Sequence, residues 1–138
     1  VIYSPVKKCC FYACKEQGAF HLDDTDKARN IQVCAHYPGG ASRKIIIAGT
    51  HKARCPELQF FLDNLEKKFD GYELKYMGSS LKSCMVAEGE ADLYVRLGPT
   101  SEWDTAAAQC IVEEAGGLIT DTNMQALRYN TKESLLNP

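Results

Sequence analysis

Two segments of this chain place hydroxyl and charged side chains where a strand is expected to meet a helix. The first is Gly78-Ser79-Ser80-Leu81-Lys82. Glycine lets the backbone approach a ligand closely, and the hydroxyls of Ser79 and Ser80, with the free amides of a helix start, can bind an anion. Lys82 adds a positive charge in the first turn. The segment indicates an anion site, although a serine N-cap followed by a surface lysine gives the same pattern.

The second segment is Ser101-Glu102-Trp103-Asp104, at the expected start of another helix. Asp104 would lie where the helix dipole favours a negative charge, and its carboxylate is a suitable ligand for a hard cation such as Mg²⁺. A capping box, with Ser101 as the cap and Asp104 three residues later, is the alternative interpretation. One carboxylate cannot form a metal site by itself, so any further ligands must come from elsewhere.

Two other side chains are candidates for binding a phosphorylated ligand. Arg96 alternates with Leu93, Val95 and Leu97 and falls on the opposite face of that strand, where its guanidinium could hold a phosphate through two hydrogen bonds. His51 follows an apolar strand and could donate to a phosphate or stack on a base. The alternatives are a solvated edge arginine and an ordinary loop histidine.

The elements that would position these residues alternate along the second part of the chain. Strands are expected at 44–49, 72–76, 91–97 and 118–120, and helices at 56–69, at 80–88 and from 102 to the Gly116-Gly117 pair. This order predicts an α/β domain built of layers of mixed sheet and helix.

The first part of the chain has a different pattern. Short antiparallel strands are expected within 1–22, an exposed loop at 23–30, and a linker at 38–42. No helix within this part could cover the strands. We therefore predict two parts: 1–40 as strands of an incomplete N-terminal antiparallel sheet, whose other strands precede Val1, and 41–138 as a C-terminal α/β subdomain.

Composition excludes several classes of protein. The formal charge of −2 over 138 residues argues against non-specific nucleic-acid binding. The longest apolar run, 45–48, is far shorter than the roughly 20 residues of a membrane span. The seven cysteines have no regular spacing, which favours reduced thiols in a cytoplasmic protein over a disulfide framework or a zinc site. Composition leaves the oligomeric state open.

Four motifs together resemble the inositol monophosphatase superfamily, and most closely its 3′(2′),5′-bisphosphate nucleotidase branch. They are Gly-Ser-Ser-Leu-Lys at 78–82, Leu-Tyr-Val-Arg at 93–96, Trp-Asp-Thr-Ala-Ala at 103–107 and Glu-Ala-Gly-Gly at 114–117. The resemblance implies the C-terminal portion of an αβαβα layered fold. It also implies Mg²⁺-assisted attack of water on a phosphate monoester, in this branch the 3′-phosphate of adenosine 3′,5′-bisphosphate, which gives AMP and phosphate.

The resemblance assigns roles to residues of this chain. Asp104 matches a catalytic aspartate that binds the metal, while Ser80, Lys82 and Arg96 match positions that hold the phosphorylated nucleotide, and Ser79 lies beside them. His51 matches a histidine near the nucleotide, although Thr50 precedes it here where the family often has serine. Two cations, Lys82 and Arg96, suit a substrate with two phosphates.

One departure from the family pattern is large. The family's other metal ligands come from a glutamate and an Asp-Pro-x-Asp-Gly-Thr run, and this chain contains no such run. The chain is therefore expected to be a fragment that is inactive alone, with the remaining Mg²⁺ ligands outside it. Two alternatives remain: a sugar phosphatase of the inositol monophosphatase type, and a non-catalytic anion-binding module.

Overall fold

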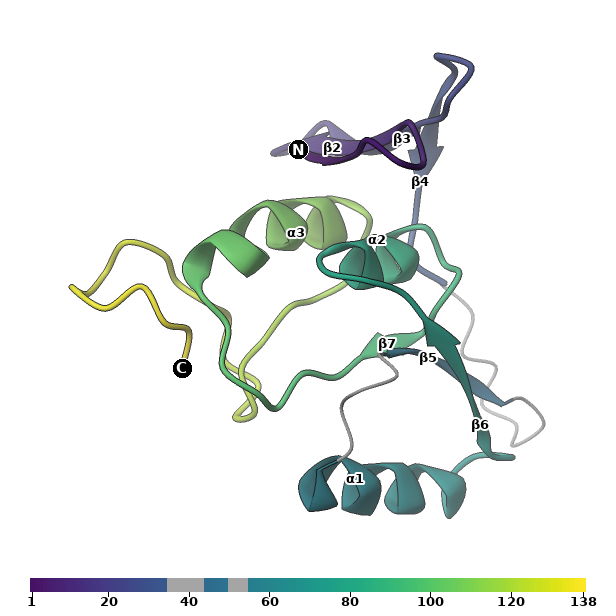
Figure 1. Ribbon diagram of the computed structural model, residues 1–138, viewed down its shortest axis with the longest axis vertical. Coiled ribbons are helices and arrows are strands. Elements are labelled where there is room, and N and C mark those ends of the chain that lie inside the picture. The colour runs from purple at the N-terminus through teal and green to yellow at the C-terminus, as the bar shows by residue number, and fades with distance from the viewer. Residues whose placement is uncertain (35–43, 50–54) are drawn as a thin grey trace.

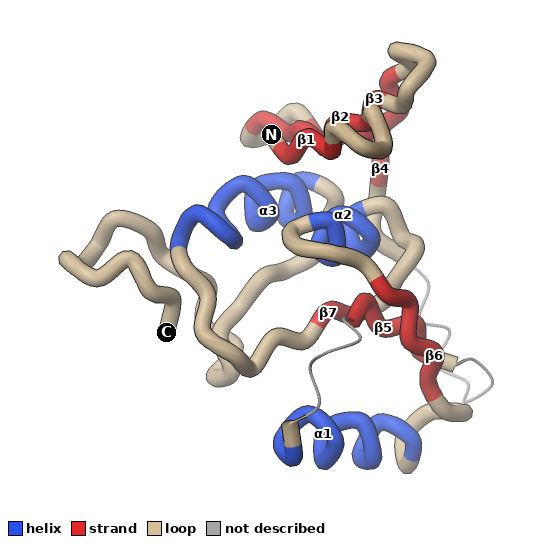
Figure 2. The backbone as a smooth tube through the Cα atoms, in the orientation of Figure 1, coloured by secondary structure: helices blue, strands red, loops and turns tan. Residues whose placement is uncertain are grey.

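A computed structural model describes residues 1–34, 44–49 and 55–138 as two sheets and three helices (Figures 1 and 2). The first sheet is antiparallel and has the order β1-β2-β3-β4, with bounds Ile2–Ser4, Cys9–Cys14, Gly18–Leu22 and Ala28–Ile31. The second is parallel and has the order β6-β5-β7, with bounds Tyr72–Tyr76, Ile45–Gly49 and Leu93–Tyr94. The helices are α1 (Pro56–Glu66), α2 (Leu81–Ala87) and α3 (Glu102–Glu114).

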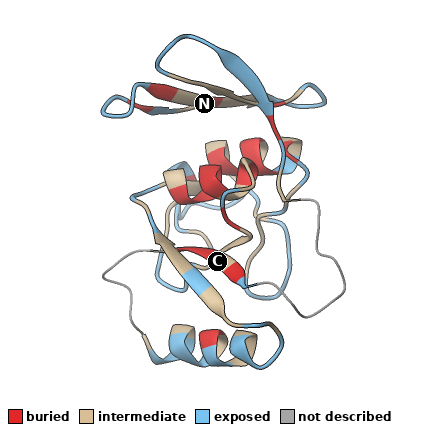
Figure 3. Cartoon of the chain, turned by 90° about the vertical axis from the view of Figure 1, so that its right-hand side faces the viewer, coloured by how far each residue is buried: buried red, intermediate tan, exposed pale blue. Residues whose placement is uncertain are grey.

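The elements are stacked in four layers, which Figure 1 shows from the antiparallel sheet, through α2 and α3, to the parallel sheet and finally α1. Figure 3 shows that the middle helices are largely buried, whereas α1 is exposed along most of its surface. This mixed α/β layering confirms the predicted fold class.

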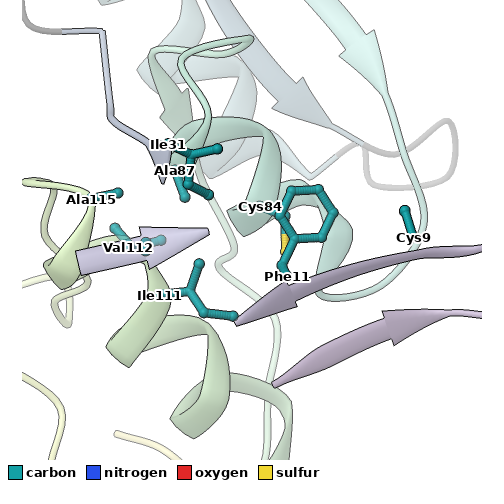
Figure 4. Close-up of a cluster of buried hydrophobic side chains, with 9 residues drawn as sticks. Cys9, Phe11, Ile31, Cys84, Ala87, Ile111, Val112 and Ala115 are labelled. Carbon is teal, nitrogen blue, oxygen red and sulfur yellow. The ribbon is translucent and has the colours of Figure 1, made fainter. Parts of the chain in front are cut away.

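Helices α2 and α3 cover one face of the antiparallel sheet, so this face is closed by elements of the second part of the chain. The shared core combines Cys9, Phe11, Ala19 and Ile31 of the sheet with five helical or helix-end residues, Cys84, Ala87, Ile111, Val112 and Ala115 (Figure 4). Side chains that alternate along a strand point to opposite faces, and the buried Cys9 and Phe11 therefore mark the inner face of β2.

The parallel sheet is packed on both faces. Ile45 and Ile47 of β5 pack with Leu62 of α1, while Ala48 packs with Met85 of α2. A strand covered on both sides reads as a continuous apolar run, which is why Ile45-Ile46-Ile47-Ala48 was recognisable in the sequence.

Three expected elements differ from the structure. The segment 23–30 was expected to be an exposed loop, but β4 pairs with β3 from Ala28 to Ile31; its three exposed residues, Ala28, Arg29 and Asn30, concealed this edge strand. The expected strand 91–97 is reduced to Leu93–Tyr94, because only these residues pair with β5. The expected strand 118–120 is a single bridge between Thr120 and Ala126.

Candidate functional site

The loop between β6 and α2 carries the first candidate motif. Ser79 adopts a positive φ of 49°, an uncommon conformation for a residue with a side chain, and Ser80 precedes the first residue of α2. The Ser80 side chain makes no capping hydrogen bond, so its hydroxyl does not fulfil the role of an ordinary N-cap.

Lys82 is buried, in contrast to the surface lysine that the alternative interpretation required: its exposed fraction is 4%. Its Nζ donates to the carbonyl oxygens of Ser79 at 2.9 Å and Met77 at 3.4 Å. Two of its three N–H groups therefore hold the loop that contains Ser79 and Ser80. Burial lowers the pKa of the Lys82 ammonium, and the positive charge of Arg96 lowers it further.

Tyr94 lies between the two candidate cations. The Lys82 Nζ is 5.1 Å from the centroid of the Tyr94 ring, within the range of a cation–π interaction. Burial raises the pKa of the Tyr94 phenol; a hydrogen bond and charge from Arg96 oppose this, and the negative charge of Asp104 adds to it. Lys82 therefore contacts the Tyr94 ring, Arg96 acts on its hydroxyl, and the charge of Asp104 reaches it.

Arg96 is exposed and extends from the segment after β7. Its Nη2 donates to the carbonyl oxygen of Pro99 at 3.2 Å, which holds the guanidinium close to the loop before α3. The strand alternation placed Tyr94 and Arg96 on one face, and this was the sequence signal that could have identified Tyr94 as part of the site.

Asp104 lies in the first turn of α3 and takes part in a capping box. Its Oδ2 accepts from the backbone N–H of Ser101 at 2.9 Å, and its own N–H donates to the Ser101 carbonyl oxygen at 2.9 Å. The side chain of Asp104 is exposed. Asp104 therefore caps α3 through its Oδ2 atom, and its Oδ1 atom takes no part in this capping hydrogen bond.

The described part of the chain does not fit a complete magnesium site. Among residues 1–34, 44–49 and 55–138, no group of three His, Cys, Asp or Glu side chains could hold a metal ion. Asp104 offers one hard carboxylate oxygen, whereas Mg²⁺ requires near-octahedral oxygen coordination. We therefore derive no reaction step through a metal from these residues.

The predicted residues are brought together in part. Lys82 and Arg96 are close enough for their charges to interact, and Asp104 interacts with the Tyr94 between them. Ser79 and Ser80 lie on the loop that Lys82 holds. His51 lies outside the described residues. No described helix is long and apolar enough to cross a membrane.

Comparisons with known proteins show to which family the chain belongs. The whole chain, residues 1–138, matches the Inositol monophosphatase family. It is 37% identical over 139 residues to the 3′(2′),5′-bisphosphate nucleotidase CysQ of Aggregatibacter actinomycetemcomitans, and 38% identical over 138 residues to that of Salmonella typhimurium. These alignments cover 100% of this chain and 49% and 51% of the two relatives.

A solved structure gives the same result. The crystal structure of CysQ from Bacteroides thetaiotaomicron, titled a bacterial member of the inositol monophosphatase family, superposes with a TM-score of 0.83 at 35% identity. The superposition covers 100% of this chain and 54% of that one, so the chain spans about half the length of the relatives that it matches. This protein belongs to the inositol monophosphatase family.

Proposed function

We propose that the chain forms the substrate-phosphate side of a Mg²⁺-dependent phosphomonoesterase that removes the 3′-phosphate from adenosine 3′,5′-bisphosphate, giving AMP and phosphate. Members of this family generally depend on a metal and act on small phosphorylated molecules. The observation that carries the proposal is the buried Lys82, which lies 5.1 Å from the centroid of the Tyr94 ring and close enough to Arg96 for their charges to interact.

The positive charges of Lys82 and Arg96 support a substrate that carries two phosphates. The positive charge of Arg96 is close enough to lower the pKa of Lys82, and two such neighbouring cations attract a ligand with more than one negative group. Arg96 is exposed and can turn its planar guanidinium toward a phosphate, while the more deeply held Lys82 keeps one N–H beyond its two carbonyl bonds. The hydroxyls of Ser79 and Ser80, on the same loop, would add donors to a phosphate oxygen.

Asp104 has a separate role in the proposal. With Oδ2 fixed by the Ser101 N–H, the other oxygen, Oδ1, would supply one of the oxygen ligands of Mg²⁺. When bound, that ion would activate water and stabilise the leaving oxygen. The other ligands would come from polypeptide outside this chain, and we therefore expect no turnover by residues 1–138 alone.

A chimera tests this proposal. The part of Bacteroides thetaiotaomicron CysQ that this chain does not cover would be fused before Val1, and phosphate release would be measured with and without Mg²⁺. We expect Mg²⁺-dependent release from adenosine 3′,5′-bisphosphate, little from inositol 1-phosphate, and at least about a hundredfold loss in D104N. A preference for inositol 1-phosphate would replace the nucleotide assignment with a sugar phosphatase.

The chain without the fused segment provides the second part of the test. Mg²⁺-dependent phosphate release by residues 1–138 alone would contradict the shared-site proposal. A folded chimera that binds the nucleotide but releases no phosphate would instead support a non-catalytic anion-binding module.

A further inference from the structure

The C-terminal tail returns to the beginning of α3 and pairs with it. Leu136 forms a bridge with Ser101, the Glu102 N–H donates to the Leu135 carbonyl oxygen at 2.8 Å, and the Asn137 N–H donates to the Thr100 carbonyl oxygen at 2.8 Å. Figure 1 shows this yellow tail beside the first turn of α3. The last residues of the chain are therefore fastened to the segment that carries Asp104.

The side chain of Asn137 makes three of the contacts between the tail and the start of α3. Its Nδ2 lies 2.9 Å from Thr100 Oγ1, 3.0 Å from the Ser101 carbonyl oxygen and 3.0 Å from Thr105 Oγ1. A carbonyl oxygen can only accept, so the amide nitrogen, and not its oxygen, must face Ser101. Asn137 thus joins residues on both sides of Asp104 through one amide group.

Ser101 connects Asn137 to Asp104, because it is hydrogen-bonded to both residues. The Ser101 carbonyl oxygen accepts from both Asn137 Nδ2 and the Asp104 N–H, while the Ser101 N–H donates to Asp104 Oδ2. Because the Asp104 side chain is exposed, packing does little to fix its carboxylate, and the bond from Ser101 sets its direction. Movement of the 100–101 backbone would move the carboxylate with it.

Two other contacts hold the tail against α3, one at its first residue, Glu102, and one near its middle, at Gln109. The Asn130 N–H donates to Oε2 of the buried Glu102 at 2.9 Å, and the Tyr129 hydroxyl donates to Gln109 Oε1 at 2.5 Å. These bonds attach the tail independently of Asn137. Loss of the Asn137 amide should therefore loosen the start of α3 without releasing the whole tail.

We propose that Asn137 is a positioning residue, which fixes the 100–105 segment so that the Asp104 carboxylate keeps one orientation. The contact itself is independent of the proposed function, but its importance for catalysis rests on the role proposed there for Asp104. Since a misplacement of about 1 Å at a reacting group can lower turnover about a hundredfold, a tail 33 residues away in sequence can affect the site.

The chain offers a direct probe, because Trp103, the only tryptophan, adjoins Asp104 and is exposed. The experiment compares N137A with N123A, whose asparagine lies in an exposed turn. In residues 1–138, we expect amide hydrogen exchange at Ser101, Glu102 and Asp104 to become about tenfold faster in N137A only, with β2 and β3 unchanged. Time-resolved anisotropy of Trp103 should show more rapid local motion.

A conservative variant covers the case in which N137A does not fold. T100V removes one acceptor of the Asn137 amide while keeping the side-chain shape, and we expect about threefold faster exchange at the same amides. Exchange at 101–104 that stays within about twofold of wild type in the folded variants would overturn the proposal.

The chimera separates this proposal from the proposed function. We expect N137A to lower kcat about tenfold with KM within about twofold, and N123A to change neither. Full kcat in N137A, together with loss of activity in D104N, would overturn the positioning role alone. Undiminished activity in D104N would overturn the role proposed for Asp104, whatever the exchange results.

Discussion

The ammonium of Lys82 lies over the ring of Tyr94, 5.1 Å from its centroid, and donates to two carbonyl oxygens of the loop before α2. A buried ammonium is costly unless its N–H groups are satisfied, and these three contacts meet that requirement. Lys82 therefore links β7 to the loop that carries Ser79 and Ser80. One cation both supports the loop and contributes charge to the candidate site.

The aromatic ring of Tyr94 should matter more for stability than its hydroxyl. We expect Y94A to lower the free energy of unfolding by about 2 kcal/mol, because it removes a half-buried ring and the cation–π contact. Y94F keeps both and should cost less than about 1 kcal/mol, through loss of the hydrogen bond with Arg96. Urea unfolding of both variants measures the difference, and equal losses would contradict it.

Lys82 should make stability depend on alkaline pH. Its pKa in the folded chain is below the ordinary value of 10.5, so between these two values the unfolded chain binds more protons. The free energy of unfolding of the wild type, relative to K82M, should therefore rise with pH through that window. Urea unfolding between neutral pH and 10.5 tests this, with tyrosine titration cancelling in the comparison. A difference that falls with pH would contradict the burial of a charged Lys82.

Glu114 should make stability depend on pH in the acidic range, and in the same direction. Its carboxylate accepts from the backbone N–H groups of Glu16 and Gly18, both at 2.9 Å, and these bonds lower its pKa. The stabilisation is fully present above the ordinary value of 4.5 and is lost as the pH falls through the lower folded value. E114Q should therefore lose less stability than the wild type on acidification.

The neighbouring Glu113 provides the control for that experiment. Its carboxylate accepts from Gln109 on the same helix, whereas the bonds to the β2–β3 turn are made by Glu114, so E113Q should retain the acid sensitivity of the wild type. Urea midpoints at about pH 5.5 and pH 3.5 would be compared for the three proteins. Identical acid sensitivity in E114Q and E113Q would show that the turn contact is unimportant.

The end of α3 has no room for a larger residue. A Cβ at Gly117 would lie 2.8 Å from side-chain methyl groups of Val112 and Val33, and 3.3 Å from the Val112 carbonyl oxygen. We expect G117A to lower the free energy of unfolding by about 1–3 kcal/mol. The matched control is G78A, whose Cβ would meet no atom within 4 Å and which should change stability by less than about 0.5 kcal/mol. Thermal unfolding measures both, and equal stability of the two variants would contradict the packing.

Much of the fold could be predicted because local patterns coincide with tertiary packing. The apolar run at 45–48 became β5, and Pro56 with the apolar side chains after it became α1. Strand β4 could not be predicted in this way, since its only buried residue is Ile31 and its Arg29 pairs with Glu88, which is 59 residues away. An edge strand stabilised by such a contact carries little local signal.

The apolar residues of α3 show a second limit of prediction from sequence. Trp103 has helical spacing with the apolar residues Ala106, Ala107, Cys110 and Ile111, which would predict a buried side chain, but the structure leaves Trp103 69% exposed and buries Ala108, Ile111 and Val112. Ile111 and Val112 belong to the core shared with the antiparallel sheet, and Trp103 does not. Periodicity identified the helix but could not show where the neighbouring sheet ends.

The candidate site was predictable only as separate motifs. Ser80, Lys82, Arg96 and Asp104 could be selected by residue type and by position at element ends, and they remain the proposed site residues. Tyr94 could have been added, because it alternates with Arg96 on one face of the strand. Asn137 could not be selected, because its importance comes from contacts with residues far away in the sequence. An asparagine in a polar tail is not unusual by itself.

The most direct test of the account is an NMR titration of residues 1–138 with adenosine 3′,5′-bisphosphate, using inositol 1-phosphate and K82M as controls. The account predicts amide shifts concentrated in 78–82 and 94–96, with binding by the nucleotide at least about tenfold tighter than by inositol 1-phosphate and weakened about tenfold in K82M. Shifts elsewhere in the described chain, or none at millimolar nucleotide, would contradict the claim that this surface holds the substrate phosphates.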